Sequence, residues 1–107
     1  MPNQGLVDNL PPDACVEVPV LASRRGLDPL RAGPLPEHLA ILTGGNSLCE
    51  ELAVAGFLEG DPEKIYHAIC FDPLTSAVLS LAEIRKMVNE MFAANKAYLP
   101  RFKKHKV

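Results

Sequence analysis

Residues 9–26, "NLPPDACVEVPVLASRRG", decide how the first part of this chain folds. Asn, Pro and Gly frame a short apolar run in which Val16, Val18 and Val20 alternate with other side chains. Successive side chains of a strand point to opposite faces, so this period of two predicts a strand from Ala14 to Leu21 with its valines on one face. The strand comes almost at the start of the sequence, where little precedes it that could pair with it.

The residues that follow predict the return strand of a β-hairpin. Ser23-Arg24-Arg25-Gly26 is typical of a tight turn, because Gly26 can adopt the positive φ that such turns require. Leu27 to Ala32 would form the second strand, placed at an edge by Pro29, which has no N–H to donate to a ladder. Since an isolated hairpin is only marginally stable in water, we expect this one to pack against further structure.

Beyond Pro36, a residue type that suits the first turn of a helix, the apolar residues change to helical spacing. The side chains expected on one face are Leu39, Leu42, Leu48, Leu52, Ala55 and Leu58. Gly44-Gly45 interrupts this pattern, and each glycine costs a helix about 1 kcal/mol relative to alanine. We therefore predict a kink or a break there, with Asn46 or Ser47 capping a second segment that runs to Glu59.

The next stretch, "GDPEKIYHAICFDP" at residues 60–73, predicts a helix with defined ends. Gly60 would end the preceding helix, Asp61 is a good capping residue, and Pro62 suits the first helical position. Asp72-Pro73 would end the helix, because a residue before proline disfavours helical geometry.

The last predicted helix begins with a capping box at Ser80-Leu81-Ala82-Glu83 and ends before Pro100. Apolar residues follow the box at helical spacing: Ile84, Met87, Val88, Met91 and Phe92. The predicted fold class is therefore α+β, with an N-terminal β-hairpin followed by three or four helices. We expect one domain over residues 1–100 and a basic tail over residues 101–107.

Composition narrows the classes of function. The 107 residues leave room for one domain, and the net charge of −2 disfavours a nucleic-acid-binding surface. No apolar run approaches the ~20 residues of a membrane span. The start, "MPNQGLVDNLPPD", is not that of a signal peptide. We expect neither a nucleic acid nor a membrane as a partner.

The tail "RFKKHKV" holds four basic and no acidic residues, which leaves seven basic and thirteen acidic residues in the rest of the chain. Its basic members are Arg101, Lys103, Lys104 and Lys106. We interpret the tail as a solvated end or as a partner for the acidic body, in preference to a patch for phosphate or nucleic acid.

The cysteines, Cys15, Cys49 and Cys70, are odd in number and widely spaced. They form neither a disulfide framework nor a structural zinc motif. Reduced thiols in a cytoplasmic protein are the simplest interpretation.

Several stretches occur together in a specific order: "NLPPDACVEVPVL", "LP" at residues 35–36, "GD" at 60–61, "DPLTSAVLSLAEIRKMVNEM", and "YLP" at 98–100. In this order and spacing the chain resembles the C-terminal part of the NAD-dependent glycoside hydrolases of family 4, and most of all the α-galactosidase-like members. The resemblance runs from about Pro2 to Pro100.

The resemblance implies a fold like that of lactate and malate dehydrogenases. It also implies an unusual glycosidase chemistry in the complete enzyme. A tightly held NAD would oxidise the sugar at C3, manganese would stabilise an enolate, and a tyrosine base would remove the C2 proton before the glycosidic bond is eliminated. The resemblance implies α-galactosides as the substrates, and such a carbohydrate would bind only to the complete enzyme.

None of the residues that the family uses for this chemistry transfers to this sequence. The Gly-rich turn of a dinucleotide site has no match, since "TGGNS" at residues 43–47 lacks the G-x-G-x-x-G spacing. The family's metal-binding Cys and His and its catalytic Tyr lie upstream of the region that this chain covers. The resemblance therefore assigns no catalytic, cofactor-binding or metal-binding residue here, and implies NAD and manganese only for the complete enzyme.

Other residue pairs invite a chemical interpretation but favour a structural one. His67 and Cys70 form an H-x-x-C pair on one helical face, yet two ligands do not make a metal site, and Cys70 fits a small buried apolar residue. Glu17 alternates with the valines and is expected to face solvent or a partner. Tyr66 and Tyr98 lack an activating cation in the sequence and are interpreted as packing residues.

Two sets of residues are candidates for contacts in a complete enzyme. Asn3 and Asn9 lie in the connection before the hairpin and are the residues we place near substrate, with turn formation as the alternative. The apolar faces of the later helices are candidates for an oligomer interface, with core packing as the alternative. Their members are Ile65, Ile69, Met87, Met91 and Phe92.

Three roles remain open for the chain. It can be the C-terminal domain of a glycosidase that needs its N-terminal catalytic half or a homo-oligomer, and it is then inactive alone. It can be the complementing half of a split glycosidase, or a stand-alone protein-interaction module.

Overall fold

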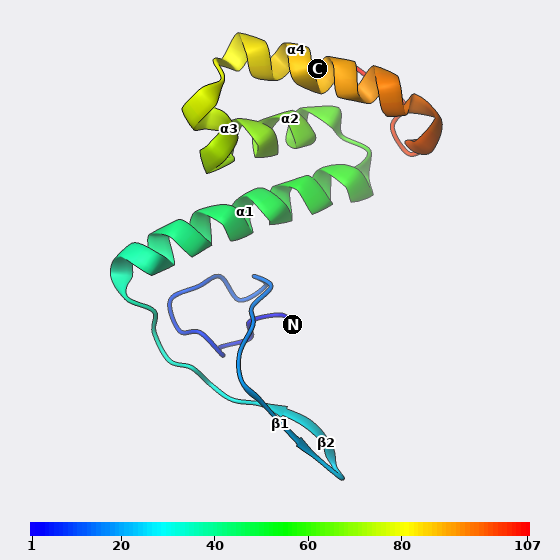
Figure 1. The fold of residues 1–107 in the computed structure, drawn as a ribbon. Coiled ribbons are helices and arrows are strands. Elements are labelled where there is room, and N and C mark those ends of the chain that lie inside the picture. Colours follow the sequence, from blue (N-terminus) through cyan, green and yellow to red (C-terminus); the bar gives the residue numbers. More distant parts are fainter. The chain divides into compact units, whose positions relative to one another are not determined.

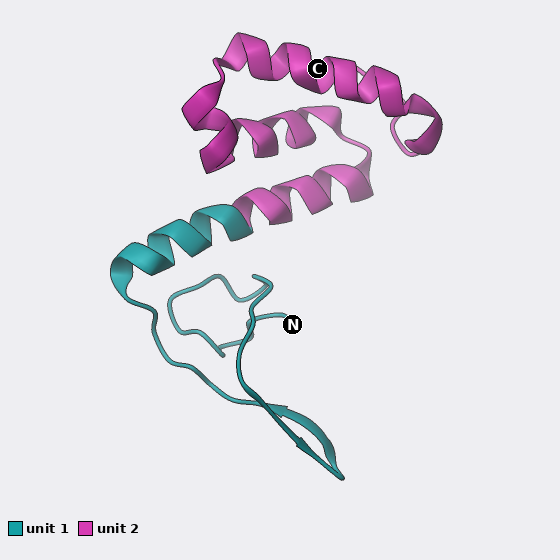
Figure 2. Cartoon of the chain, viewed as in Figure 1, with its two compact units in different colours: residues 1–47 teal, residues 48–107 magenta.

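The computed structural model describes residues 1–107 and consists of a short hairpin followed by helices (Figure 1). The elements in chain order are β1 (Val20–Ser23), β2 (Gly26–Pro29), α1 (Glu37–Glu59), α2 (Pro62–Phe71), α3 (Pro73–Val78), α4 (Leu81–Asn95) and the 3₁₀ turn η1 (Lys96–Tyr98). The predicted α+β class, with a hairpin and then three or four helices, is confirmed. Two compact units divide the chain, Met1–Ser47 and Leu48–Val107 (Figure 2).

The hairpin pairs β1 with β2 in antiparallel register, from Val20 opposite Pro29 to Ser23 opposite Gly26. The predicted turn is confirmed, with Gly26 at φ +126°. The predicted strand bounds were wrong at both outer ends, since pairing begins at Val20 and not at Ala14, and β2 ends at Pro29. The reason is that the residues before Val20 pair only over a short stretch, where Pro2 forms an isolated antiparallel bridge with Cys15, and no continuous ladder connects this bridge to Val20.

The first unit, Met1–Ser47, has a small core of apolar residues from its loops. Its buried members are Val7, Leu10, Ala14 and Val16. Of the three valines, Val16 is buried, Val18 packs against this cluster, and Val20 is exposed, so the environment along the valine face changes from core to solvent. The hairpin therefore projects beyond the core that holds its base.

α1 is one continuous helix of 23 residues, so the predicted kink or break at Gly44-Gly45 was wrong. Glycine weakens a helix through the entropy of the unfolded chain and does not obstruct helical geometry. Asn46 and Ser47 are consequently interior helical residues and cap nothing. The predicted end of the helix is confirmed, since Gly60 follows Glu59 with φ +70°.

The second unit, Leu48–Val107, follows its sequence signals closely. Asp61 caps α2 by accepting a hydrogen bond from the Glu63 N–H at 3.0 Å, with Pro62 at the first position. Gly56 lets α2 approach the end of α1, because a Cβ there would lie 2.9 Å from Lys64 Cβ. A capping box joins Ser80 and Glu83 at the start of α4, as predicted.

α3 was not predicted as a separate helix. Asp72 ends α2 and also caps α3 by accepting a hydrogen bond from the Thr75 N–H at 2.7 Å. The same Asp-Pro pair that stops one helix therefore starts the next.

The core of the second unit lies between α2 and α4. Its buried side chains are Tyr66, Ile84, Val88, Phe92 and Phe102. Positions 84, 88 and 92 repeat every four residues, which places them on one face of α4. None of the helices in the chain combines the length and apolar character that a bilayer-spanning segment requires.

Candidate functional site

An apolar groove of about 520 Å³ lies in the second unit. Its walls come from α2, α4, η1, the end of α1 and the tail, and the lining residues are Phe57, Ile65, Ile69, Met87, Val88, Met91, Phe92, Asn95, Tyr98, Leu99 and Phe102. The lining has no charged side chain, and its polar groups are the amide of Asn95 and the hydroxyl of Tyr98. Such a lining favours contact with another apolar surface.

All five residues predicted for an interface line this groove. Phe92 is buried, Ile65, Ile69 and Met87 are half-buried, and Met91 is 60% exposed. The unbranched side chains of Met87 and Met91 adapt readily to different partners. The structure thus brings the predicted residues together, and their role in an oligomer stays a prediction.

Sequence reasoning missed the contribution of the tail to the groove. Phe102 is 3% exposed and packs edge-on against Phe92, with ring centroids 5.2 Å apart, and against Phe57 at 6.3 Å. A phenylalanine among lysines was the available signal, because burial of an aromatic ring is favourable and the neighbouring lysines can stay in water at no cost.

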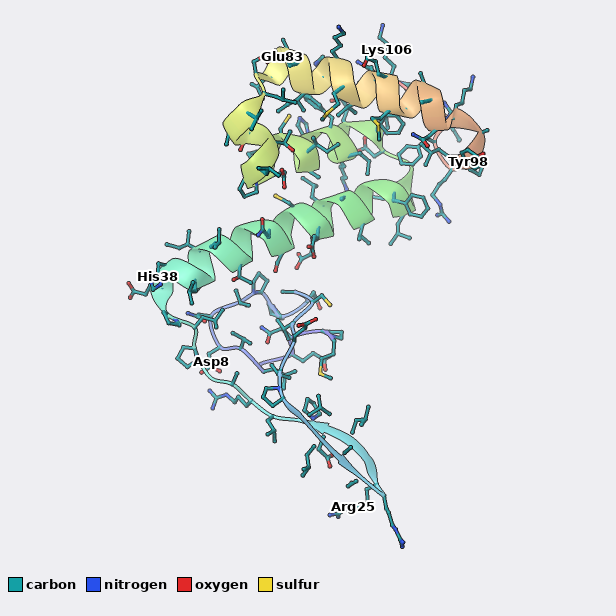
Figure 3. The ribbon with its side chains drawn as sticks, in the orientation of Figure 1. Asp8, Arg25, His38, Glu83, Tyr98 and Lys106 are labelled. Carbon is teal, nitrogen blue, oxygen red and sulfur yellow. The ribbon has the colours of Figure 1, made fainter.

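The tail is consequently not a solvated end. Arg101 donates to the Leu58 carbonyl at 2.9 Å, and Asn89 bonds both the N–H and the carbonyl of Val107, at 2.9 and 3.2 Å. Lys103, Lys104 and Lys106 remain exposed; Figure 3 labels Lys106.

A second, polar hollow of about 470 Å³ lies where this tail meets the turn before α2. It is lined by Glu59, Gly60, Asp61, Pro62, Glu63, Arg101, Lys103, Lys104 and Lys106. Acidic residues of the turn therefore face basic residues of the tail, which fits the interpretation of the tail as a partner for the acidic body. Gly60 is required at this point, because a Cβ there would lie 2.7 Å from the Arg101 carbonyl oxygen.

Tyr66 and Tyr98 have different environments. Tyr66 is buried with the Arg85 guanidinium 4.5 Å from its ring centroid. Hydrogen bonding to the Cys70 thiol, and then burial, raise the pKa of Tyr66, while Arg85 acts in the opposite direction. A phenol with a raised pKa stays protonated at neutral pH and fits a packing role. Tyr98 is 82% exposed, so its interpretation as a packing residue was wrong.

The two asparagines predicted near substrate both organise loops of the first unit. Asn3 is 1% exposed, and its Nδ2 donates to the carbonyls of Val7, Leu10 and Pro11 at 2.8–3.1 Å. The Asn9 side chain bonds both backbone groups of Leu35 at 2.8 Å. These bonds describe turn formation, the alternative, and proximity to substrate stays a prediction.

The remaining chemically suggestive residues are dispersed. His67 is exposed, whereas Cys70 is half-buried and packs against the core. All three cysteines are free thiols. Burial, followed by the charges of Asp72 and Glu50, raises the pKa of Cys49, which keeps this thiol protonated and unreactive at neutral pH.

The residues present do not fit the cofactors that the resemblance implies for a complete enzyme. His, Cys, Asp and Glu side chains form no group of three that could hold a metal ion. The nearest glycine cluster, Gly44-Gly45, lies inside α1 and does not follow a strand, so it cannot form a dinucleotide-binding turn.

Comparison with known proteins gives a consistent result. The family model described as "Family 4 glycosyl hydrolase C-terminal domain" matches residues 1–75. An α-galactosidase of Bacillus subtilis (strain 168) is 40% identical over 101 residues, which cover 94% of this chain and 23% of that enzyme. An α-galacturonidase of Lachnoclostridium phytofermentans is 34% identical over 94% of this chain and 22% of its own length.

Solved structures show the same relationship. A 6-phospho-α-glucosidase from gut microorganisms, in complex with NAD and glucose-6-phosphate, superposes on 96% of this chain with a TM-score of 0.84 and 33% identity. A second such enzyme, in complex with NAD and Mn²⁺, has a TM-score of 0.85 at 23% identity and supports the fold alone. This chain covers 23% of each of these structures, so it spans less than a quarter of the relatives it matches.

Proposed function

The chain belongs to the family 4 glycosyl hydrolases as their C-terminal domain, and from this membership we propose that it serves an α-galactosidase-like enzyme as the part that packs on a catalytic half. The observation that carries the proposal is the extent of the alignments, which cover nearly all of this chain but less than a quarter of each relative. The complete enzyme would hydrolyse O-glycosyl bonds with NAD, which a solved relative contains, and with manganese, as the family resemblance implies.

The chain alone would be inactive. Its residues offer no metal cluster and no dinucleotide turn, and its buried tyrosine has a raised pKa. The catalytic groups would therefore come from an N-terminal half, either joined to this part in one polypeptide or encoded separately as in a split enzyme. The free cysteines fit a reducing compartment, and we place the protein in the cytoplasm.

Exposed apolar residues on α1 support the presence of a catalytic half as a partner. Ile41 is 77% exposed, and Val54 and Leu58 are each 58% exposed. A helix with apolar residues on all sides is normally buried. Residues of the catalytic half that cover these side chains would bury them, as the apolar composition of α1 favours.

The groove of the second unit would contribute to self-association. Met91 is the most exposed of its five predicted interface residues, at 60%. Burying large apolar side chains against a second copy removes them from water, at about 25 cal/mol per Å². A stand-alone interaction module would use the same groove without any catalytic half, which makes it the second candidate function.

The experiment that tests the proposal is reconstitution. Nitrophenyl α-galactoside would be assayed with NAD, Mn²⁺ and reductant, using this chain alone, the N-terminal part of the Bacillus subtilis α-galactosidase alone, and both together. Activity in the mixture and none in either part is expected. Activity of this chain alone would contradict the proposal.

The oligomeric part has its own test. Met91→Asp places a charge in the groove and is expected to shift the sedimentation coefficient to that of a monomer. Ala93→Asp, an exposed position elsewhere on α4, is the matched control and should leave association unchanged. A wild-type chain that sediments as a monomer at high concentration would contradict the oligomer and leave the catalytic-half proposal standing.

A further inference from the structure

The hairpin has two outer edges, and the pairing pattern shows which backbone groups lie on each. Antiparallel residues alternate between hydrogen-bonded and non-hydrogen-bonded pairs. The Leu30 N–H donates to the Pro19 carbonyl at 2.9 Å, so that pair is hydrogen-bonded. In the observed register, Val20 and Ala22 then belong to non-hydrogen-bonded pairs. Their N–H and C=O groups point away from β2, toward the outer edge of β1.

The start of the chain already occupies the lower part of this edge. Met1 and Val16 exchange two backbone bonds, from the Met1 N to the Val16 O at 3.0 Å and from the Val16 N to the Met1 O at 2.9 Å. The Asn3 N–H donates to the Ala14 carbonyl at 2.9 Å, and Pro2 forms an antiparallel bridge with Cys15. Even-numbered residues thus face one edge from Ala14 to Ala22, and Met1 lies opposite Val16, so the part from Val18 to Ala22 is open.

The two edges differ in their capacity to accept a further strand. The outer edge of β2 carries Pro29, which has no N–H and is a typical means of blunting an edge. Pro19 does not blunt the edge of β1, because its position faces β2, where its carbonyl accepts from Leu30. The N–H groups of Val18, Val20 and Ala22 therefore remain on the open edge.

We propose that the outer edge of β1 is the acceptor site for one strand of the catalytic half, namely the polypeptide that immediately precedes the matched region in family 4 relatives. This inference rests on the proposed function and specifies where the two parts join. The register of Met1 with Val16, continued backwards, places the second residue before position 1 opposite Val18, the fourth opposite Val20 and the sixth opposite Ala22.

Two observations favour this occupant over a second copy of the chain. The family match begins at residue 1, and more than three quarters of each relative lies outside the matched part. Because Met1 is already paired antiparallel with Val16, a polypeptide that preceded this position in a relative would enter in the direction and register needed to continue along β1. Adding a strand would also give the marginal hairpin the third strand that stable sheets require.

Peptide binding tests the site without any enzyme activity. A fluorescent peptide of about ten residues, copied from the segment that precedes the matched region of the Bacillus subtilis α-galactosidase, would be titrated with the full chain. Saturable binding is expected, and the amide resonances of Val18, Val20 and Ala22 should shift. No binding, or binding that leaves these three resonances unmoved, would overturn the proposal.

Backbone methylation of the peptide makes the test specific to the register. N-methylation of the second or fourth residue from its C-terminal end removes a donor that faces β1, and should weaken binding by about tenfold. Methylation of the third residue is the control, because its N–H points away from β1. An equal loss of affinity at all three positions would overturn the register. Because only the peptide is modified, misfolding of the chain cannot cause the loss.

Substitutions in the chain distinguish the two edges. Ala22→Pro removes a donor from the open edge, whereas Leu27→Pro removes one from the outer edge of β2 at the directly opposite position. The first should weaken peptide binding by about tenfold and the second should not. Sedimentation showing that the chain self-associates, that Ala22→Pro abolishes this, and that the peptide does not bind would assign the edge to a second copy and overturn the proposed occupant.

The outcomes separate this inference from the proposed function. Reconstitution that survives Ala22→Pro and the absence of peptide binding would overturn the strand site and leave the catalytic-half role intact. Peptide binding in the predicted register without reconstituted activity would support the strand site and count against the enzymatic role.

Discussion

The first unit buries an asparagine among backbone carbonyls, whereas the second unit buries three aromatic rings among aliphatic side chains. Asn3 makes four hydrogen bonds to loops of Met1–Ser47, and only four apolar residues are buried around it. In Leu48–Val107, Tyr66, Phe92 and Phe102 share a core with two aliphatic residues. Polar bonds thus define the first unit, and apolar packing defines the second.

This difference suggests a division of labour. The second unit has the elements of a self-sufficient helical core, with caps at the start of α2, α3 and α4. The first unit leaves its hairpin fully exposed and its β1 edge open, so its extended part is completed by something else. We expect the two units to respond differently to substitutions.

Phe92→Ala is expected to have the largest effect. Removing a buried aromatic ring costs about 3–5 kcal/mol of unfolding free energy, because burial is lost and a cavity remains. Phe92 is 5% exposed and contacts the Phe102 ring. Urea denaturation followed by circular dichroism should show the loss in the helical signal. Phe71→Ala is the control, since Phe71 is 70% exposed and its loss should change little.

Asn3→Ala is expected to affect the first unit alone, by about 2–3 kcal/mol. The substitution leaves the Val7 N–H and several buried carbonyls without their side-chain partner. Hydrogen exchange should become faster at Val7 and Ala14 and remain unchanged on α4. Asn46→Ala, at an exposed helical position, should leave both units unchanged. Equal loosening of both units would contradict the division described above.

Gly45→Ala is expected to stabilise the chain by about 1 kcal/mol. The position is helical, and a Cβ added there meets no atom within 4 Å. Gly56→Ala is the opposite case, because its Cβ would lie 2.9 Å from Lys64 Cβ, and should destabilise. Thermal denaturation of both variants would measure the pair, and a lower melting temperature for Gly45→Ala would show that a kink is needed in solution.

Acid should weaken the second unit through its helix caps. Hydrogen bonding to Thr75 lowers the pKa of Asp72, and hydrogen bonding to Ser80 lowers the pKa of Glu83. A carboxyl with a lowered folded-state pKa stabilises the fold when ionised, and that contribution is lost as the pH falls below the ordinary values of 3.8 and 4.5. Unfolding measured between neutral pH and acid should show the decrease, and Asp72→Asn with Glu83→Gln should flatten it.

The parts of the fold that could be predicted from sequence are those fixed by local chemistry. Asp61-Pro62 and the Ser80 capping box start their helices through bonds within a few residues, and Gly60 ends α1 through its own backbone freedom. Helical periodicity also places the predicted interface residues on one face of α2 and one face of α4, and packing of the two helices brings both faces into one groove.

The parts that could not be predicted depend on contacts between distant residues. The strand expected from Ala14 begins at Val20, because assignment of a strand requires a neighbour that the first residues supply only at Met1–Asn3. Gly44-Gly45 stays helical because propensity is weaker than the continuity of a long helix. Burial of Phe102 in a basic tail requires knowledge of the Phe57 and Phe92 rings that receive it.

The measurement that most directly tests the role of this chain is reconstitution with the N-terminal part of the Bacillus subtilis α-galactosidase. Hydrolysis of nitrophenyl α-galactoside with NAD and Mn²⁺ should occur only when both parts are present, and Ala22→Pro should reduce it while Leu27→Pro does not. Hydrolysis by this chain alone would contradict its role as a C-terminal domain without catalytic groups of its own.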